Sequence, residues 1–195
     1  MVNQKRFSGY LIGAFFVLLG LYIVVAYNSL ISKEEKAQQM WAEVQNTYQR
    51  RLDLTPNLVN TVKGISGFEQ GTLTKVAEAR SNALRNSSGS MNAESYRQQS
   101  VAQDTLAAVS GRLIAVIEKY PVLKGTEAYR GLQVQLEGNE RRIKVSRNDF
   151  NSAVKDYNLA VRSFPKSIVA KVFGFEEKQG FEAVAGADKN VEIKF

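Results

Sequence analysis

Two pairs of glutamates have the residue type that acid–base or metal chemistry requires. Glu137 and Glu140 lie three residues apart and share one face of a helix, where two carboxylates could hold a metal ion or act as general acid and base. Arg141 and Lys144 flank them, which is the ion-pair pattern of an ordinary solvated helix. This first pair is therefore interpreted as surface charge.

The second pair, Glu176 and Glu177, is adjacent, so on a helix the two carboxylates would diverge. The glycines Gly64, Gly67 and Gly71 lack a basic residue at the phosphate-loop position and follow no predicted strand, which argues against a nucleotide loop. We predict no catalytic, cofactor-binding or metal-binding residues, no cofactor and no small-molecule substrate.

The composition points the same way, because the sequence contains no His and no Cys. Their absence removes Ser-His-Asp and Cys-His nucleophiles, thiolate zinc sites, haem attachment and disulfides together. An enzyme would have to use Asp, Glu, Lys, Tyr or Ser. We predict a protein that is not an enzyme and keep a carboxylate-based enzyme as the second alternative.

The densest polar cluster comprises Arg50, Arg51, Asp53, Asn57 and Asn60. It surrounds Pro56, where a helix loses one backbone donor. Buried polar groups need partners, so a polar network that supports the proline site is favoured over a ligand site.

The chain is basic, with 26 Lys and Arg against 19 Asp and Glu. These charges are interleaved, as in Lys33-Glu34-Glu35-Lys36, which is typical of a solvated face of mixed sign. We therefore predict no nucleic-acid partner. Attraction to anionic lipid headgroups is the functional alternative.

The N-terminal region is predicted to be a membrane anchor over residues 10–31. No residue from Phe7 to Ser32 is charged, and about 20 apolar residues suffice to cross a bilayer. A cleaved signal peptide is the competing interpretation, but the apolar run exceeds a usual signal-peptide core. Lys5 and Arg6 precede the run and favour a short cytoplasmic tail, residues 1–9, with the domain outside the cytoplasm.

After the anchor, apolar residues recur at helical spacing. One face collects Ala37, Trp41, Val44, Tyr48 and Leu52, and a second stretch collects Leu73, Val76, Ala77 and Leu84. Pro56 is expected to interrupt the first helix, either with a new helix starting near Asp53 or with a kink. Residues 86–90 are predicted to be a loop.

A further helix is predicted from about Asn92 to Tyr120. Its core face is expected to hold Leu106, Val109, Leu113, Val116, Ile117 and Tyr120. Pro121 and Gly125 end it, and Thr126 is a plausible N-cap for the helix that follows.

That last helix has the strongest pattern, because large apolar residues recur at every seventh position. They are Tyr129, Leu136, Ile143, Phe150, Tyr157 and Phe164, and a companion row holds Leu132, Asn139, Ser146, Ala153 and Ala160. A sustained seven-residue repeat requires a helical neighbour with coiled-coil-like packing. It also makes self-association between chains possible.

Residues 165–195 are predicted to form an amphipathic segment and a tail. Ile168, Val172 and Phe173 suit one or two helical turns that Gly174 closes, and residues 191–195 alternate like an extended strand. A tail that packs on the bundle is favoured over an aromatic, partner-binding arm, since exposed Phe side chains are costly.

These segments resemble the bacterial LemA family nearly throughout the chain. The motifs are residues 50–59 (RRLDLTPNLV), 62–64 (VKG), 76–80 (VAEAR), 136–143 (LEGNERRI), 148–154 (NDFNSAV), 157–158 (YN), 164–165 (FP) and 173–175 (FGF), with 27–28 (YN) at the end of the anchor. The resemblance implies a single-pass membrane protein with an antiparallel helical bundle outside the cytoplasm, and it supplies no reaction or ligand.

The predicted fold is all-α: a transmembrane helix, an elongated antiparallel bundle of three to four long helices over residues 32–164, and a short C-terminal tail. The predicted function is a non-enzymatic, membrane-anchored scaffold or adaptor in the bacterial cell envelope, with envelope proteins as partners. The alternative is an anionic-lipid-binding or membrane-organising protein.

Overall fold

A computed structural model describes residues 2–63, 70–87 and 92–181, and these residues form helices without strands. The helices are α1 (Val2–Val62), α2 (Gln70–Arg85), α3 (Ala93–Ile117), α4 (Pro121–Lys124), α5 (Glu127–Arg162) and α6 (Lys166–Phe173). The predicted all-α class is confirmed.

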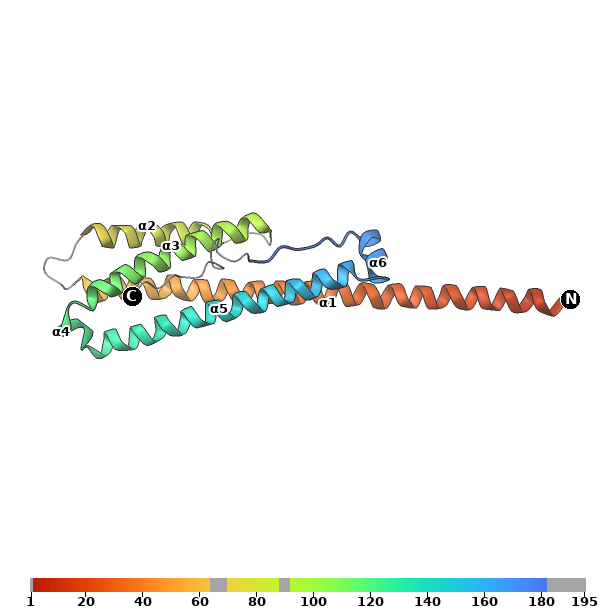
Figure 1. Ribbon diagram of the computed structural model, residues 1–195, viewed down its shortest axis with the longest axis horizontal. Coiled ribbons are helices and arrows are strands. Elements are labelled where there is room, and N and C mark those ends of the chain that lie inside the picture. The colour runs from red at the N-terminus through yellow and green to blue at the C-terminus, as the bar shows by residue number, and fades with distance from the viewer. Residues whose placement is uncertain (1, 64–69, 88–91, 182–195) are drawn as a thin grey trace, which may run out of the picture.

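Two helix pairs build an elongated bundle (Figure 1). Helices α1 and α5 run side by side in opposite directions over most of the length of α5, and α2 and α3 form a hairpin beside α1. The short α4 links α3 to α5 at one end, and α6 lies at the other end. The N-terminal part of α1 projects beyond the bundle past α6.

Helix α1 continues through Pro56 to Val62, so the alternative of a new helix starting near Asp53 is wrong and one long helix passes the proline. A proline cannot donate to the carbonyl four residues earlier, which here belongs to Leu52. Arg80 of α2 supplies the missing donor, because its Nε binds the Leu52 carbonyl at 3.0 Å. One side chain from a neighbouring helix thus satisfies the group that Pro56 leaves open.

The seven-residue rows of α5 form the seam with α1. All five companion residues are buried, and the large row is buried at Tyr129, Ile143, Phe150 and Tyr157. Phe164 breaks the prediction, since α5 ends at Arg162 and this ring is 82% exposed. The small companions let the α1 backbone approach closely: Asn139 Nδ2 donates to the Thr47 carbonyl at 3.2 Å.

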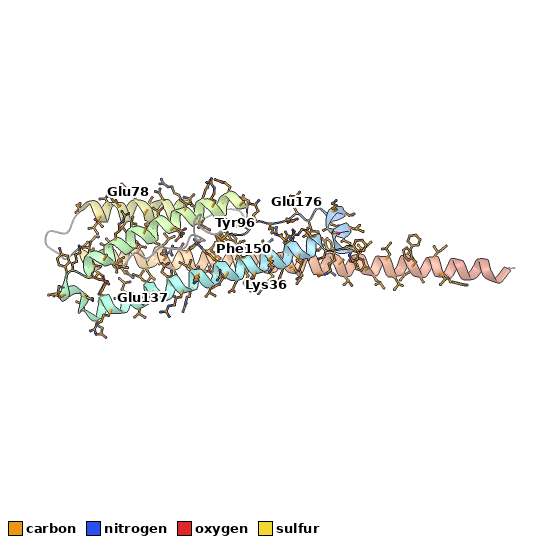
Figure 2. All side chains as sticks on the ribbon, in the orientation of Figure 1. Lys36, Glu78, Tyr96, Glu137, Phe150 and Glu176 are labelled. Atoms are coloured by element: carbon orange, nitrogen blue, oxygen red, sulfur yellow. The ribbon has the colours of Figure 1, made fainter. Side chains whose placement is uncertain are left out.

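An aromatic cluster fills the centre of the bundle. Trp41 of α1, Tyr96 of α3, Phe150 of α5 and Phe181 of the C-terminal segment have ring centroids 4.5–5.8 Å apart in every pairing. Figure 2 shows Tyr96 and Phe150 side by side in this core. Edge-to-face and tilted rings of this kind each add about 0.5–1.5 kcal/mol beyond the area that they bury.

Helix α3 is shorter than predicted. It ends at Ile117, and Tyr120 is exposed instead of joining the core face. The predicted N-cap at Thr126 is confirmed, because its hydroxyl accepts from the Tyr129 amide at 3.3 Å. The apolar stripe of α3 holds at Leu106, Leu113 and Ile117, which are fully buried.

The segment after α6 returns along the bundle as an extended strap, residues 175–181 (Figure 1). The side-chain amides of two asparagines of α5 form paired hydrogen bonds with the backbone of this strap, as the backbone of a neighbouring β-strand would. Asn151 donates to and accepts from the Phe181 backbone, at 3.1 and 2.8 Å, and Asn158 does the same with Lys178, at 2.7 and 2.9 Å. The predicted packing of the tail on the bundle therefore holds for this strap. Residues 191–195 lie outside the described residues.

Two described stretches are long and apolar enough to cross a membrane. One lies in α1 after Gly9 and is almost wholly exposed, with a mean hydropathy of 2.3. The other is α3, with a mean hydropathy of 1.2, but α3 packs its stripe against α1 and α2. We therefore assign α3 to the bundle core, and the apolar N-terminal part of α1 is the candidate membrane span.

Ile143→Asp tests this core. Its side chain is 4% exposed between α1 and α5, so a carboxylate there should cost at least about 3 kcal/mol of unfolding free energy. For a chain of this size the melting temperature should fall by roughly 6–12 °C, measured by circular dichroism on the full chain in detergent. Val145→Asp, two residues along and exposed, is the control and should melt like the wild type. A native-like melting temperature for Ile143→Asp would contradict the core assignment.

Candidate functional site

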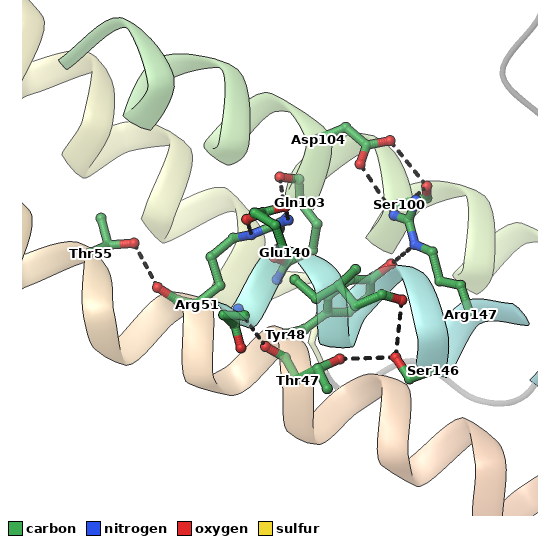
Figure 3. A network of polar contacts seen from close by, with 12 residues as sticks. Thr47, Tyr48, Arg51, Thr55, Ser100, Gln103, Asp104, Glu140, Ser146 and Arg147 are labelled. Carbon is green, nitrogen blue, oxygen red and sulfur yellow. Dashed lines mark hydrogen bonds and ion pairs between the residues drawn. The ribbon is translucent and has the colours of Figure 1, made fainter. Parts of the chain in front are cut away.

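A buried arginine occupies the middle of the bundle. Arg51 of α1 is 4% exposed, and its guanidinium makes a two-pronged ion pair with Glu140 of α5, through Nε at 2.9 Å and Nη2 at 2.5 Å. Its Nη1 donates to Gln103 of α3, at 2.9 Å to the carbonyl and 3.2 Å to the side chain. Figure 3 shows Arg51 joining these helices. Burial of a charge on this scale requires such pairing.

A second set of polar side chains lies one turn along the same seam between α1 and α5 (Figure 3). The Thr47 and Ser146 hydroxyl oxygens lie 3.2 Å apart between α1 and α5, and each is also within hydrogen-bonding distance of a carbonyl of its own helix, Val44 at 2.7 Å and Ile143 at 3.1 Å. Arg147 donates to the Tyr48 hydroxyl at 2.7 Å and to Ser100 at 3.0 Å. The network therefore links α1, α3 and α5 at one level of the bundle.

Several buried or half-buried phenols have a raised pKa. Burial raises the pKa of Tyr48, and the neighbouring Arg147 opposes part of that rise. Burial raises the pKa of Tyr157 to about 12, and that of Tyr96 also lies well above its ordinary value. These phenols are therefore protonated at neutral pH, and the Tyr48 hydroxyl serves as a hydrogen-bonding partner of Arg147.

The residues of the polar cluster predicted around Pro56 lie on different sides of α1. Arg51 points into the bundle, whereas Arg50 is exposed and Asp53 accepts from Gln49 on the surface at 2.8 Å. Asn57 and Asn60 line an open groove against the start of α5. Hence only Arg51 belongs to the buried network, and Arg80 supports Pro56 instead of the predicted residues.

The predicted carboxylate pairs are also separated. Glu140 binds Arg51, 89 residues away, while Glu137 accepts from Gln133 on the surface at 3.1 Å. The interpretation of Glu140 as charge patterning along one helix was therefore wrong. Glu177 lies 3.9 Å from Arg162. Gly64 and Gly67 lie outside the described residues, and Gly71 lies in the first turn of α2.

Sequence reasoning missed the glutamines of α3. Gln99 and Gln103 are buried, and Gln99 Nε2 donates to the carbonyls of Asn86 and Ser87, both at 3.1 Å. Their positions continue the helical stripe that leads to Leu106, so the periodicity already marked them as inward-facing. Because both residues are polar, the pattern of apolar residues at helical spacing does not include them. The site is a structural polar network that fixes the relative register of three helices.

The comparisons with known proteins decide the family. The model of the LemA family matches residues 40–195, which is most of the bundle and everything after it. The chain belongs to the LemA family. The match begins beyond the apolar part of α1, so the bundle carries the likeness independently of the anchor.

Named relatives of this LemA protein include magnetosome proteins. Magnetosome protein MamQ 2 of Paramagnetospirillum magneticum is 23% identical over 185 residues, covering 85% of this chain and 68% of the relative. Magnetosome protein MamQ of Magnetospirillum gryphiswaldense shows the same identity and coverage. Together with the apolar N-terminal part of α1, these findings describe a membrane-associated helical protein with bacterial relatives.

The Arg51–Glu140 pair can be tested by a double-mutant cycle. Glu140→Ala should cost about 1–2 kcal/mol, since it leaves a buried guanidinium with only Gln103, while the half-exposed carboxylate is partly screened by solvent. Combined with Arg51→Met, denaturant unfolding should give a coupling energy of about 1–2 kcal/mol. Glu137→Ala, on the same helix, is the control and should stay within roughly 0.5 kcal/mol of wild type. A coupling near zero would contradict the structural role of the pair.

Proposed function

We propose that the protein is a non-enzymatic, membrane-anchored scaffold or adaptor that presents a helical surface to partner proteins of the bacterial cell envelope. One observation carries this proposal: the anchor and the first helix of the bundle are the same helix, α1. Its 61 residues span about 90 Å. Because no linker separates the two parts, the bundle stands at a fixed position relative to the bilayer.

The outer face of α5 is the surface best suited to a partner. One row along this face, spaced by seven residues, contains only small or apolar residues. It comprises Gly131, Gly138, Val145, Ser152 and Leu159. Val145 and Leu159 are exposed, and α5 contacts α1 through its other face. A partner helix could pack along such a row.

The two glycines of this row support an external contact. Glycine inside a helix costs about 0.5–1 kcal/mol relative to alanine. A Cβ at Gly131 or Gly138 would meet nothing within 4 Å, so packing within the chain does not require glycine at either position. A close approach by another helix would explain both. The large row that suggested self-association is occupied by α1 of the same chain, so pairing between copies would also have to use this outer face.

Photo-crosslinking tests this surface in native envelopes. A photoreactive residue at Val145 should give discrete protein adducts, and Gly138→Leu should abolish them, because a Cβ there meets nothing in the chain and the leucine blocks the approach of a partner helix. Gly111→Leu, a glycine of α3 that is equally open, should leave the adducts intact. Adducts that survive Gly138→Leu, or that form equally from a probe at Val101 of α3, would contradict the proposed surface.

We propose that the bundle lies outside the cytoplasm. The chain has no native Cys, so a single introduced Cys is the only site for thiol labelling. Val122 of α4 is 87% exposed at the end of the bundle far from the anchor. A membrane-impermeant maleimide should label Val122→Cys in intact cells as completely as in permeabilised ones. Labelling that requires permeabilisation would reverse the orientation.

A further inference from the structure

Helix α6 lies against the part of α1 that leaves the membrane. Its buried side, Val169 and Ala170, packs with Ala26 and Leu30 of α1 and with Ala160 of α5. Lys166 Nζ donates to the Ser29 hydroxyl at 3.0 Å. Figure 1 places α6 at the end of the bundle from which the apolar part of α1 projects.

The outer side of this helix is apolar and uncovered. Its large side chains are Ile168 and Val172, one turn apart and 57% and 73% exposed, and Phe164, just before the helix, is 82% exposed. Phe173, at the end of the helix, is 52% exposed and lies against the Tyr27 ring of α1. The sequence placed Phe164 in the inward-facing row of the preceding helix and predicted amphipathic turns at Ile168 and Val172, and all three side chains are exposed. Exposed large apolar side chains on and just before one short helix are unfavourable in water.

The length of the uncharged segment places α6 at the bilayer boundary. The stretch from Phe7 to Ser32 would be about 39 Å long as a helix, which exceeds the roughly 30 Å hydrocarbon core. With Phe7 at the opposite boundary of the hydrocarbon core, the last one or two turns before Ser32 lie at headgroup level, and α6 packs on these turns at Ala26 and Leu30. Tyr27 contacts the Phe173 and Phe175 rings there, at 5.0 and 5.6 Å between centroids, as in an aromatic belt.

We propose that α6 is an interfacial helix whose outer face, Ile168 and Val172, inserts into the leaflet from which α1 emerges, together with the preceding Phe164. The occupant of this face is the phospholipid bilayer, because the face is continuous with the membrane-spanning part of α1. The bundle then has two attachments to the membrane and cannot pivot about α1. This inference rests on the anchor and holds whether or not the outer face of α5 binds a partner.

Apolar area drives this insertion more than charge. Arg162, Lys166 and Lys171 lie near these side chains, but Glu176 and Glu177 follow closely and Glu177 is 3.9 Å from Arg162. The local excess of positive charge is small, so salt should not release α6 from the membrane. This separates insertion from simple adsorption to anionic headgroups.

Spin labelling of the full chain in phosphatidylcholine–phosphatidylglycerol vesicles tests the proposal. A nitroxide at Val172→Cys should collide readily with oxygen and poorly with a water-soluble nickel chelate, so its oxygen-to-nickel ratio should exceed that of Val134→Cys severalfold. Val134 lies on α5 with a similar exposure, 70%, and serves as the matched control. The ratio at Val172 should be the same at low and high salt.

Three results would overturn the proposal. A ratio at Val172 equal to that at Val134 would place α6 in water. Protection of Val172 from both reagents would show that protein covers the face. Loss of the high ratio at high salt would indicate adsorption without insertion. A supporting variant is Ile168→Glu, exposed and harmless to packing, which should lower the ratio reported from Val172→Cys.

Discussion

The structure depends on one helix, α1, that continues from an apolar, membrane-type segment into a bundle in water. Helix α1 is apolar on all sides where it projects from the bundle, and from Ala26 onward it buries a single stripe. A helix satisfies its own backbone hydrogen bonds in lipid and in water alike, which allows one element to pass from one solvent to the other without a break. The bundle is therefore built on the anchor itself, and α5 and α6 pack against a helix whose position the membrane already sets.

The polar network at the centre has a related role. A long apolar seam such as that between α1 and α5 can slide by one turn at modest cost, whereas Arg51 finds Glu140 and Gln103 only in one register. A buried guanidinium without those partners would be strongly unfavourable. The network thus explains charged and polar residues in the core without invoking a reaction, and the strap held by Asn151 and Asn158 closes the aromatic cluster above it.

Both proposals concern surfaces that the fold leaves open. The apolar face of α6 lies next to the anchor, and the glycine-containing face of α5 extends away from it. A membrane-held bundle with a free helical face suits the organisation of proteins along a membrane. The likeness to the magnetosome protein MamQ fits a membrane setting, although the identity of 23% carries no specific partner to this chain.

The sequence alone determined the features that arise from local periodicity and composition. The apolar length of the anchor, the stripe from Ala37 to Leu52, the rows of α5 and the cap at Thr126 each depend on residues within a few turns, so their spacing predicted them. Only the tertiary structure decided the choices between distant residues. Arg80 reaches Leu52 and lets α1 pass Pro56, Arg51 takes Glu140 across 89 positions, and Phe181 enters the core. The exposed face of α6 belongs to the same group, because whether an apolar side chain is buried depends on which neighbour the folded chain brings to cover it.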